Sequence, residues 1–242
     1  MRITPFLVLA ACGPQYLAPS ESPGQIEGLP DDYANAARQT GVPVEILLAI
    51  AHAETRMEMV VGSEEFPGLD SAHGVMALRG ADLQYAADLA GIDPEEVRTL
   101  RSANVSAAAH LLEQYALEER VISHDLNAWA PVVARYAGYD NEDAVAEYIH
   151  HAVYGALRDG ISTEEVQLAP RDVAAEWPLP SSDLDRGIDG GAVWSPSPNY
   201  NSRGGQPVDF VVIHTCEGSY SGCWGWLTNP AAGASAHYVV NE

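Results

Sequence analysis

The segment 207–242 reads PVDFVVIHTCEGSYSGCWGWLTNPAAGASAHYVVNE, and its apolar pattern sets our expectation for the C-terminal part of the chain. Val208 and the run 210–213 are apolar and mostly β-branched, with glycines on both sides, which predicts a buried strand. His214 ends this strand, where an imidazole is held rigidly enough to ligate a metal. A histidine in such a place is more commonly a partly buried, hydrogen-bonded side chain, so position alone leaves both roles open.

Several blocks around His214 resemble one enzyme family in order and spacing. Residues 194–200, 208–215, 217–220, 226–230 and 235–240 are similar to the zinc-dependent N-acetylmuramoyl-L-alanine amidases, the superfamily that includes the peptidoglycan-recognition proteins. The resemblance implies that His214 is the first zinc ligand and that His237 belongs to the substrate-side framework. It also implies that a zinc-activated water cleaves the amide between the lactyl group of N-acetylmuramic acid and L-alanine.

The remaining zinc ligands of that family come from further downstream than Glu242, the last residue here. A catalytic zinc site needs three protein ligands and one open position, and His214 alone cannot hold the ion. We therefore expect a longer natural protein, in which residues 193–242 are the first part of an α/β amidase domain. Within it the pattern predicts a short helix at 224–227 and a strand at 235–240.

Three cysteines occur in the chain, and two of them flank a short loop after His214. If Cys12 is lipidated, Cys216 and Cys223 remain, and they are close enough in sequence to form a disulfide. A pair of thiolates at zinc-like spacing is the rival interpretation. We favour the disulfide because the leader indicates an oxidising compartment, and the recognition proteins carry a comparable small loop.

The first residues, MRITPFLVLAAC, resemble a bacterial lipoprotein signal, with Leu9 to Cys12 matching the lipobox. This predicts cleavage before Cys12, acylation of that residue, and anchoring to the outer membrane without a span. An ordinary signal peptide and a misplaced start codon are the alternatives. Residues 13–30 are rich in Pro, Gly and Ser and are predicted to be a flexible tether.

A helical domain is predicted for residues 31–168. Two aspartates precede its first helix, Gly41 ends that helix, and Pro43 opens a second helix over 44–54. In this second helix Glu54 continues the apolar stripe of Leu47 and Ile50. A carboxyl group on a buried face loses hydration, so its pKa rises and it can act as a general acid. The ordinary alternative is a solvated glutamate paired with a nearby arginine.

Three blocks of the helical region, ILLAIAHAETR (46–56), SAHGVMAL (71–78) and ARYAG (134–138), resemble the lysozyme-like domain of soluble lytic transglycosylases. The resemblance implies that Glu54 is the single acid and base of glycan cleavage, with Met76 packed beside it and Tyr136 near the active site. Ala77 replaces the usual glutamine of the family, and the usual asparagine after Tyr136 is missing. Each change removes a polar group that would orient a sugar, so a glycan-binding remnant is the alternative.

Helix-start residues and prolines predict where the remaining elements begin and end. Asp93 with Pro94 predicts a helix start, Asn104 is predicted to cap an Ala-rich helix, and residues 140–143 open another helix. Pro131 is predicted to kink a helix or to mark its first turn. Proline, glycine and serine then accumulate over 169–192, which predicts an interdomain linker.

Composition limits the partners. The chain has 242 residues with 34 acidic and 12 basic side chains, and its formal net charge is −22. This charge argues against binding to nucleic acid. No run in the predicted mature region is long enough to span a membrane.

The combined expectation is a multidomain chain with an all-α lysozyme-like domain followed by the first part of an α/β amidase domain. We expect a zinc-dependent peptidoglycan hydrolase of the cell envelope that contacts glycan and stem peptide and is attached to the membrane by a lipid. Two alternatives remain: a lytic transglycosylase that acts through Glu54 alone, and a wall-binding lipoprotein without catalysis.

Overall fold

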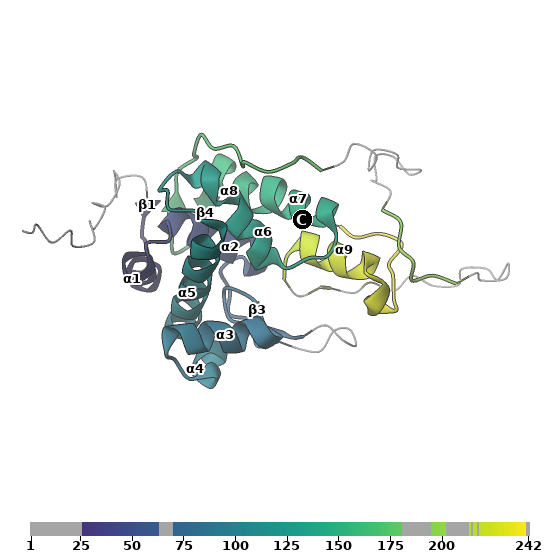
Figure 1. Ribbon diagram of the computed structural model, residues 1–242, viewed down its shortest axis with the longest axis horizontal. Helices are drawn as coiled ribbons and strands as arrows, with labels where there is room; N and C mark the ends of the chain where they lie inside the picture. The colour runs from purple at the N-terminus through teal and green to yellow at the C-terminus, as the bar shows by residue number, and fades with distance from the viewer. Residues whose placement is uncertain are drawn as a thin grey trace, which may run out of the picture.

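The computed structural model describes residues 26–62, 70–180, 195–201, 213, 215–216 and 218–240. Helices form most of this part, together with two small antiparallel sheets (Figure 1). Cys12, His214 and the predicted strand residues 208–212 lie outside the described residues. Within the described part, no helix has both the length and the apolar character needed to cross a membrane.

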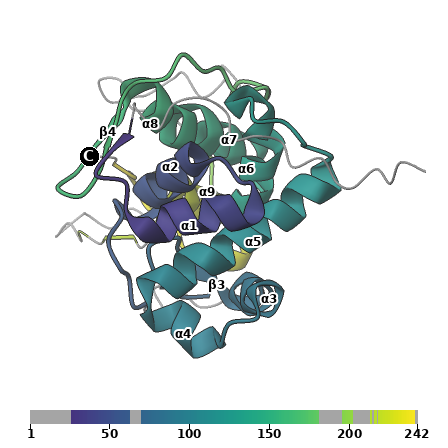
Figure 2. The same ribbon diagram turned by 90° about the vertical axis from the view of Figure 1, so that its left-hand side faces the viewer.

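Helix α2 (Val44–Thr55) is at the centre of the helical body. Its residues 46–51 are all 0 % exposed. They are apolar on every side of the helix, and a helix of this kind must be surrounded by other elements. Three elements pack against it: α1 (Asp31–Thr40), the π-helical turn η3 (Tyr148–Val153) and α8 (Tyr154–Asp159). Figure 2 shows α1 alongside α2.

A second long helix, α5 (Arg101–Glu119), organises the other side of the body. It packs against α1 and against α3 (Gly80–Ala90), α4 (Pro94–Thr99) and α6 (Ala130–Ala137). The short turn η2 (Leu126–Trp129) leads into α6. The apolar faces of these helices and of α2 join in one continuous core.

The short strands tie distant parts of the chain together. β1 (Ile26–Glu27), β5 (Gln167–Leu168) and β4 (Ile161–Ser162) form an antiparallel sheet in that order. β2 (Ala72–His73) and β3 (Leu78–Arg79) form an antiparallel pair ahead of α3. The helical body is therefore not strictly all-α, and β1 lies within the range that was predicted to be a tether.

Several predicted helix boundaries are confirmed. Gly41 ends α1 in a left-handed conformation (φ 75°). The Asp93 side chain accepts a hydrogen bond from the Glu95 N–H and caps α4. Pro131 lies in the first turn of α6. Helix α7 (Glu142–Glu147) starts where predicted, with the Asn141 side chain accepting from the Ala144 N–H.

The predicted cap at Asn104 is wrong, because α5 begins three residues earlier at Arg101. The Asn104 side chain is 0 % exposed and points into the body. It donates hydrogen bonds of 3.0 Å to the carbonyl oxygens of His73 and Val97 and accepts one of 2.8 Å from the Met76 N–H. It thus joins α4 and α5 to the β2–β3 hairpin, and polar groups buried in this way need such partners.

The C-terminal part also differs from expectation. The predicted helix at 224–227 is longer, since α9 spans Tyr220–Thr228, and the turn η5 (Pro230–Ala232) follows it. The predicted strand at 235–240 is wrong, because these residues have no regular structure and are mostly exposed. A strand needs a hydrogen-bonded neighbour to be stable, and no strand of the described part pairs with this segment.

Part of the predicted linker is packed on the helical body. The Arg171 N–H donates to the Leu157 carbonyl oxygen (2.8 Å), and the Glu176 N–H donates to that of Asn127 (3.2 Å). His150 contacts the carbonyl oxygen of Trp177 through Nε2 (3.1 Å). The beginning of the 169–192 segment is therefore docked, and residues 181–192 lie outside the described part.

We predict that Asn104→Ala destabilises the helical body by about 3 kcal/mol, because it leaves buried backbone groups of three elements without partners. Asn35→Ala, at an exposed position of α1, is the matched control and should change the free energy of unfolding by less than about 0.5 kcal/mol. Urea denaturation of both variants measures the difference. Equal losses in the two variants would contradict the structural role of Asn104.

Candidate active site

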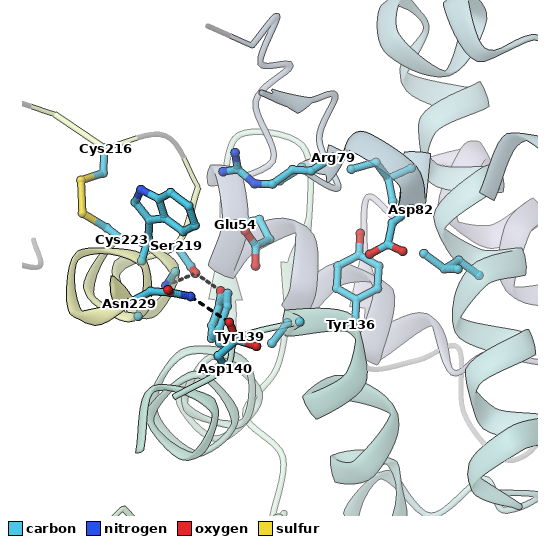
Figure 3. Close-up of a pocket in the computed structure, with 18 residues that line it drawn as sticks. Glu54, Arg79, Asp82, Tyr136, Tyr139, Asp140, Cys216, Ser219, Cys223 and Asn229 are labelled. Atoms are coloured by element: carbon cyan, nitrogen blue, oxygen red, sulfur yellow. Dashed lines mark hydrogen bonds between the residues drawn. A yellow bond between two sulfur atoms is a disulfide. The ribbon is translucent and has the colours of Figure 1, made fainter. Parts of the chain in front are cut away.

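A pocket with a volume of about 250 Å³ lies between the helical body and the segment that contains α9. We call residues 218–229 the α9 segment. The two sides of the pocket are drawn in Figure 3. The polar and aromatic residues that line it are Glu54, Arg79, Asp82, Tyr136, Tyr139 and Asp140 from the body, and Cys216, Ser219, Cys223, Trp226 and Asn229 from the C-terminal side.

Glu54 lies in the last turn of α2, and the chain turns sharply directly after it. The Thr55 hydroxyl donates to the carbonyl oxygens of Ala51 (3.1 Å) and Val75 (2.8 Å). Arg56 and Met57 then take left-handed conformations, with φ of 55° and 69°. The helix thus ends at the edge of the core, and its last carboxylate reaches the pocket.

Burial raises the pKa of the Glu54 carboxyl group above its ordinary value. The Tyr148 hydroxyl, the Arg79 guanidinium and a hydrogen bond from the Ser219 N–H each favour the ionised form and offset part of this rise. The Tyr148 hydroxyl faces the carboxylate without the alignment of a regular hydrogen bond. The neutral acid therefore persists to higher pH than for a solvated glutamate, which suits a general acid.

Three tyrosines surround this carboxyl group. The Tyr136 hydroxyl donates to the Met76 carbonyl oxygen (2.6 Å), and the Tyr139 hydroxyl pairs with Ser219 Oγ (2.7 Å). The rings of Tyr139 and Tyr148 meet edge to face, with centroids 5.6 Å apart. Burial, and next the charge of Glu54, raise the pKa of all three phenols well above 10.0, so they remain neutral.

Residues of the β2–β3 hairpin and α3 supply the charged groups of the pocket. Arg79 donates from Nη1 to the Asp70 carbonyl oxygen (2.7 Å), which orients its guanidinium. Asp82 accepts a hydrogen bond from the Tyr115 hydroxyl (3.4 Å). In Figure 3, Arg79 and Asp82 flank the side of the pocket on which Glu54 lies.

The sequence analysis found Glu54 and Tyr136 but missed Arg79, Asp82, Tyr139, Tyr148 and Ser219. These residues come from four separate parts of the chain, and no linear spacing relates them to Glu54. The one available signal was Tyr139, which follows Tyr136 by three residues across a helix-ending glycine.

The other predicted site residues are placed as follows. Met76 is 0 % exposed and belongs to the core, and its backbone carbonyl anchors Tyr136. His237 is exposed, in the irregular segment after η5. The structure contains the predicted disulfide between Cys216 and Cys223, so these sulfurs are not free thiolates.

The described residues do not form a zinc site. Among them, no group of three or more His, Cys, Asp or Glu side chains is arranged to hold a metal ion. Cys216 and Cys223 line the pocket and are bonded to each other, so neither offers a thiolate to a metal. The role predicted for His214 concerns a residue outside this part.

The comparisons with known proteins identify an amidase-related region in the chain. A stretch of 55 residues, 22% of the chain, is 44% identical to N-acetylmuramoyl-L-alanine amidase A of Achromobacter lyticus. The match spans 30% of that protein, less than a third of its length. No family model and no solved structure matches the chain.

We predict that the stability difference between wild type and Glu54→Gln depends on pH. Because the folded state raises the pKa of Glu54, wild type should lose stability relative to the variant as the pH rises from the unfolded value, about 4.3, through the folded value. Thermal unfolding of both proteins between pH 3.5 and 8 measures this difference. For a chain of this size, a change of 1 kcal/mol in the free energy of unfolding shifts the melting temperature by about 2–4 °C. A difference that stays constant with pH would contradict the raised pKa.

Proposed function

We propose that this protein is a peptidoglycan hydrolase and that its principal activity is that of an N-acetylmuramoyl-L-alanine amidase. The observation that carries this proposal is the 55-residue match at 44% identity to an enzyme of that name. The order of motifs around His214 agrees with it. The substrate is then the amide between N-acetylmuramic acid and the stem peptide.

The proposal includes zinc, held in part by His214, and a location in the cell envelope. The amidase-like motifs support the presence of zinc. The leader and the Cys216–Cys223 disulfide support export from the cytoplasm. Disulfides of this kind persist in oxidising compartments. Lipid attachment at Cys12 is the proposed anchor.

For the protein expressed from its complete gene, we predict that His214→Ala loses bound zinc and no longer releases stem peptides from purified peptidoglycan. His124→Ala, an exposed histidine of the helical body, is the control and should keep both properties. Metal analysis and chromatography of soluble peptides give the two readouts. Full peptide release by a zinc-free His214→Ala protein would refute the zinc-dependent mechanism.

A second candidate activity, cleavage of the glycan strand, is supported by the surroundings of Glu54. The carboxyl group is partly buried beside three neutral tyrosines, in a pocket bounded by Arg79 and Asp82. In this proposal the neutral Glu54 donates its proton to the glycosidic oxygen as the bond breaks, and the resulting carboxylate is stabilised by Arg79. The carboxylate then takes a proton from the hydroxyl group or water that bonds to the anomeric carbon, which restores the neutral acid.

We predict that Glu54→Gln lowers the rate of glycan-fragment release about 100-fold or more, because an amide cannot supply the proton. Glu58→Gln changes an exposed glutamate four residues later and should leave the rate unchanged. Reducing-end assays and mass spectrometry of the fragments distinguish this reaction from peptide release. Binding of peptidoglycan without either product would instead favour the non-catalytic alternative.

A further inference from the structure

We propose that the α9 segment is an autoinhibitory cap, which closes the Glu54 pocket in this conformation and must move before a glycan strand can reach Glu54. The proposal rests on the proposed glycan-cleaving function. Its structural basis is that Gly218 and Ser219, the first residues of the α9 segment, lie beside the Glu54 carboxyl group. Figure 3 draws Ser219 and Glu54.

The start of the α9 segment contacts Glu54 itself. A Cβ atom added to Gly218 would lie 3.4 Å from Glu54 Oε2 and 2.8 Å from Arg79 Nη2. The next residue, Ser219, is 3% exposed and donates its backbone N–H to the same carboxyl group. A general acid must approach the atom that it protonates to about 2.6–3.2 Å. Gly218 and Ser219 therefore compete with a glycosidic oxygen for the same position.

The space that remains beside Glu54 is small. The cavity measures about 250 Å³, whereas pockets for small organic ligands range from about 300 to 1,000 Å³. A glycan strand is a polymer and needs a groove that is open at both ends. The α9 segment forms one whole side of this cavity, so its displacement is the direct way to convert the cavity into a groove.

The cap is held by side-chain hydrogen bonds and by apolar packing. Tyr139 pairs with Ser219, Asn141 Nδ2 donates to Thr228 Oγ1 (3.1 Å), and Asn229 Nδ2 donates to Asp140 Oδ2 (2.8 Å). The first two bonds are partly buried and the third is exposed, and each contributes modestly to stability. Trp224 and Leu227 of α9 are also buried, so release of the cap breaks these bonds and exposes this apolar face.

Close packing of α9 on α7 offers a way to open the cap. A Cβ at Gly225 would lie 3.2 Å from Ala144 Cβ, so a large side chain there cannot be accommodated while α9 stays docked. Gly225→Leu should therefore push α9 away from α7. Ala231→Leu adds the same type of side chain at an exposed position after α9 and is the matched control. Thr228→Val removes one docking hydroxyl without adding bulk and is a second, milder opening variant.

The test measures access to Glu54 directly. Carbodiimide and amine labelling of the full chain, followed by peptide mass spectrometry, gives the labelling rate of Glu54 relative to the exposed Glu58. We expect Gly225→Leu to raise this ratio at least fivefold, Thr228→Val to raise it less, and Ala231→Leu to leave it unchanged. Glycan-fragment release by Gly225→Leu should rise in parallel.

The outcomes separate the cap from the activity. If Gly225→Leu and Thr228→Val leave the labelling ratio at the wild-type value, the cap proposal is overturned. It is also overturned if labelling rises but glycan release falls below wild type, because the α9 segment is then a required wall of the active site. If the labelling ratio of Gly225→Leu rises but neither wild type nor this variant releases glycan fragments, the cap proposal is supported and the proposed glycan-cleaving function is refuted.

Discussion

Burial of helix α2 is the constraint on which the rest of this structure depends. Its residues 46–51 are apolar and fully enclosed. Removing a large aliphatic side chain from water is worth about 1.5–3 kcal/mol. Four such side chains, Ile46, Leu47, Leu48 and Ile50, are therefore comparable in sum with the whole free energy of unfolding of a typical domain, about 5–15 kcal/mol. The helices around α2 form the enclosure that this burial requires.

The same constraint explains why Glu54 has unusual chemistry. Its position in the last turn of a core helix brings a carboxyl group to the boundary between the core and the pocket. Desolvation there favours the neutral acid, while Tyr148, Arg79 and Ser219 favour the carboxylate. A group balanced between two protonation states is suited to exchanging a proton with a substrate. The tyrosines add neutral hydroxyl groups, which contribute hydrogen bonds without further charge.

The two proposed activities rest on different kinds of support. The amidase proposal depends on sequence similarity and on His214, whereas the glycan-cleaving proposal depends on the geometry around Glu54. They meet at the α9 segment, which follows the His214 motif in sequence and lies beside Glu54 in space (Figure 3). If both activities are present, movement of one segment would affect access to the glycan site.

The sequence by itself determined the features that depend on local chemistry. The boundary residues Gly41, Asp93 and Asn141 were predicted because a positive φ or a side-chain cap is a property of a few neighbouring residues. Helical periodicity predicted that Leu47, Ile50 and Glu54 share one side of this helix, whereas residues 46–51 are buried on every side of α2. Asn104 was misassigned as a helix cap because that prediction also used local sequence alone. An asparagine before an Ala-rich run has the local pattern of a cap.

Tertiary structure alone decided which residues share the pocket and which distant elements contact one another. Asn104 became a buried bridge because three carbonyl and amide groups from other elements converge on it. Residues 235–240 have the alternation of a strand, but strand formation requires a partner that local sequence cannot supply. The placement of Ser219 against Glu54 joins residues 165 positions apart, and packing of α9 on α7 brings them together. Contacts at that separation depend on the whole fold, because no local pattern encodes them.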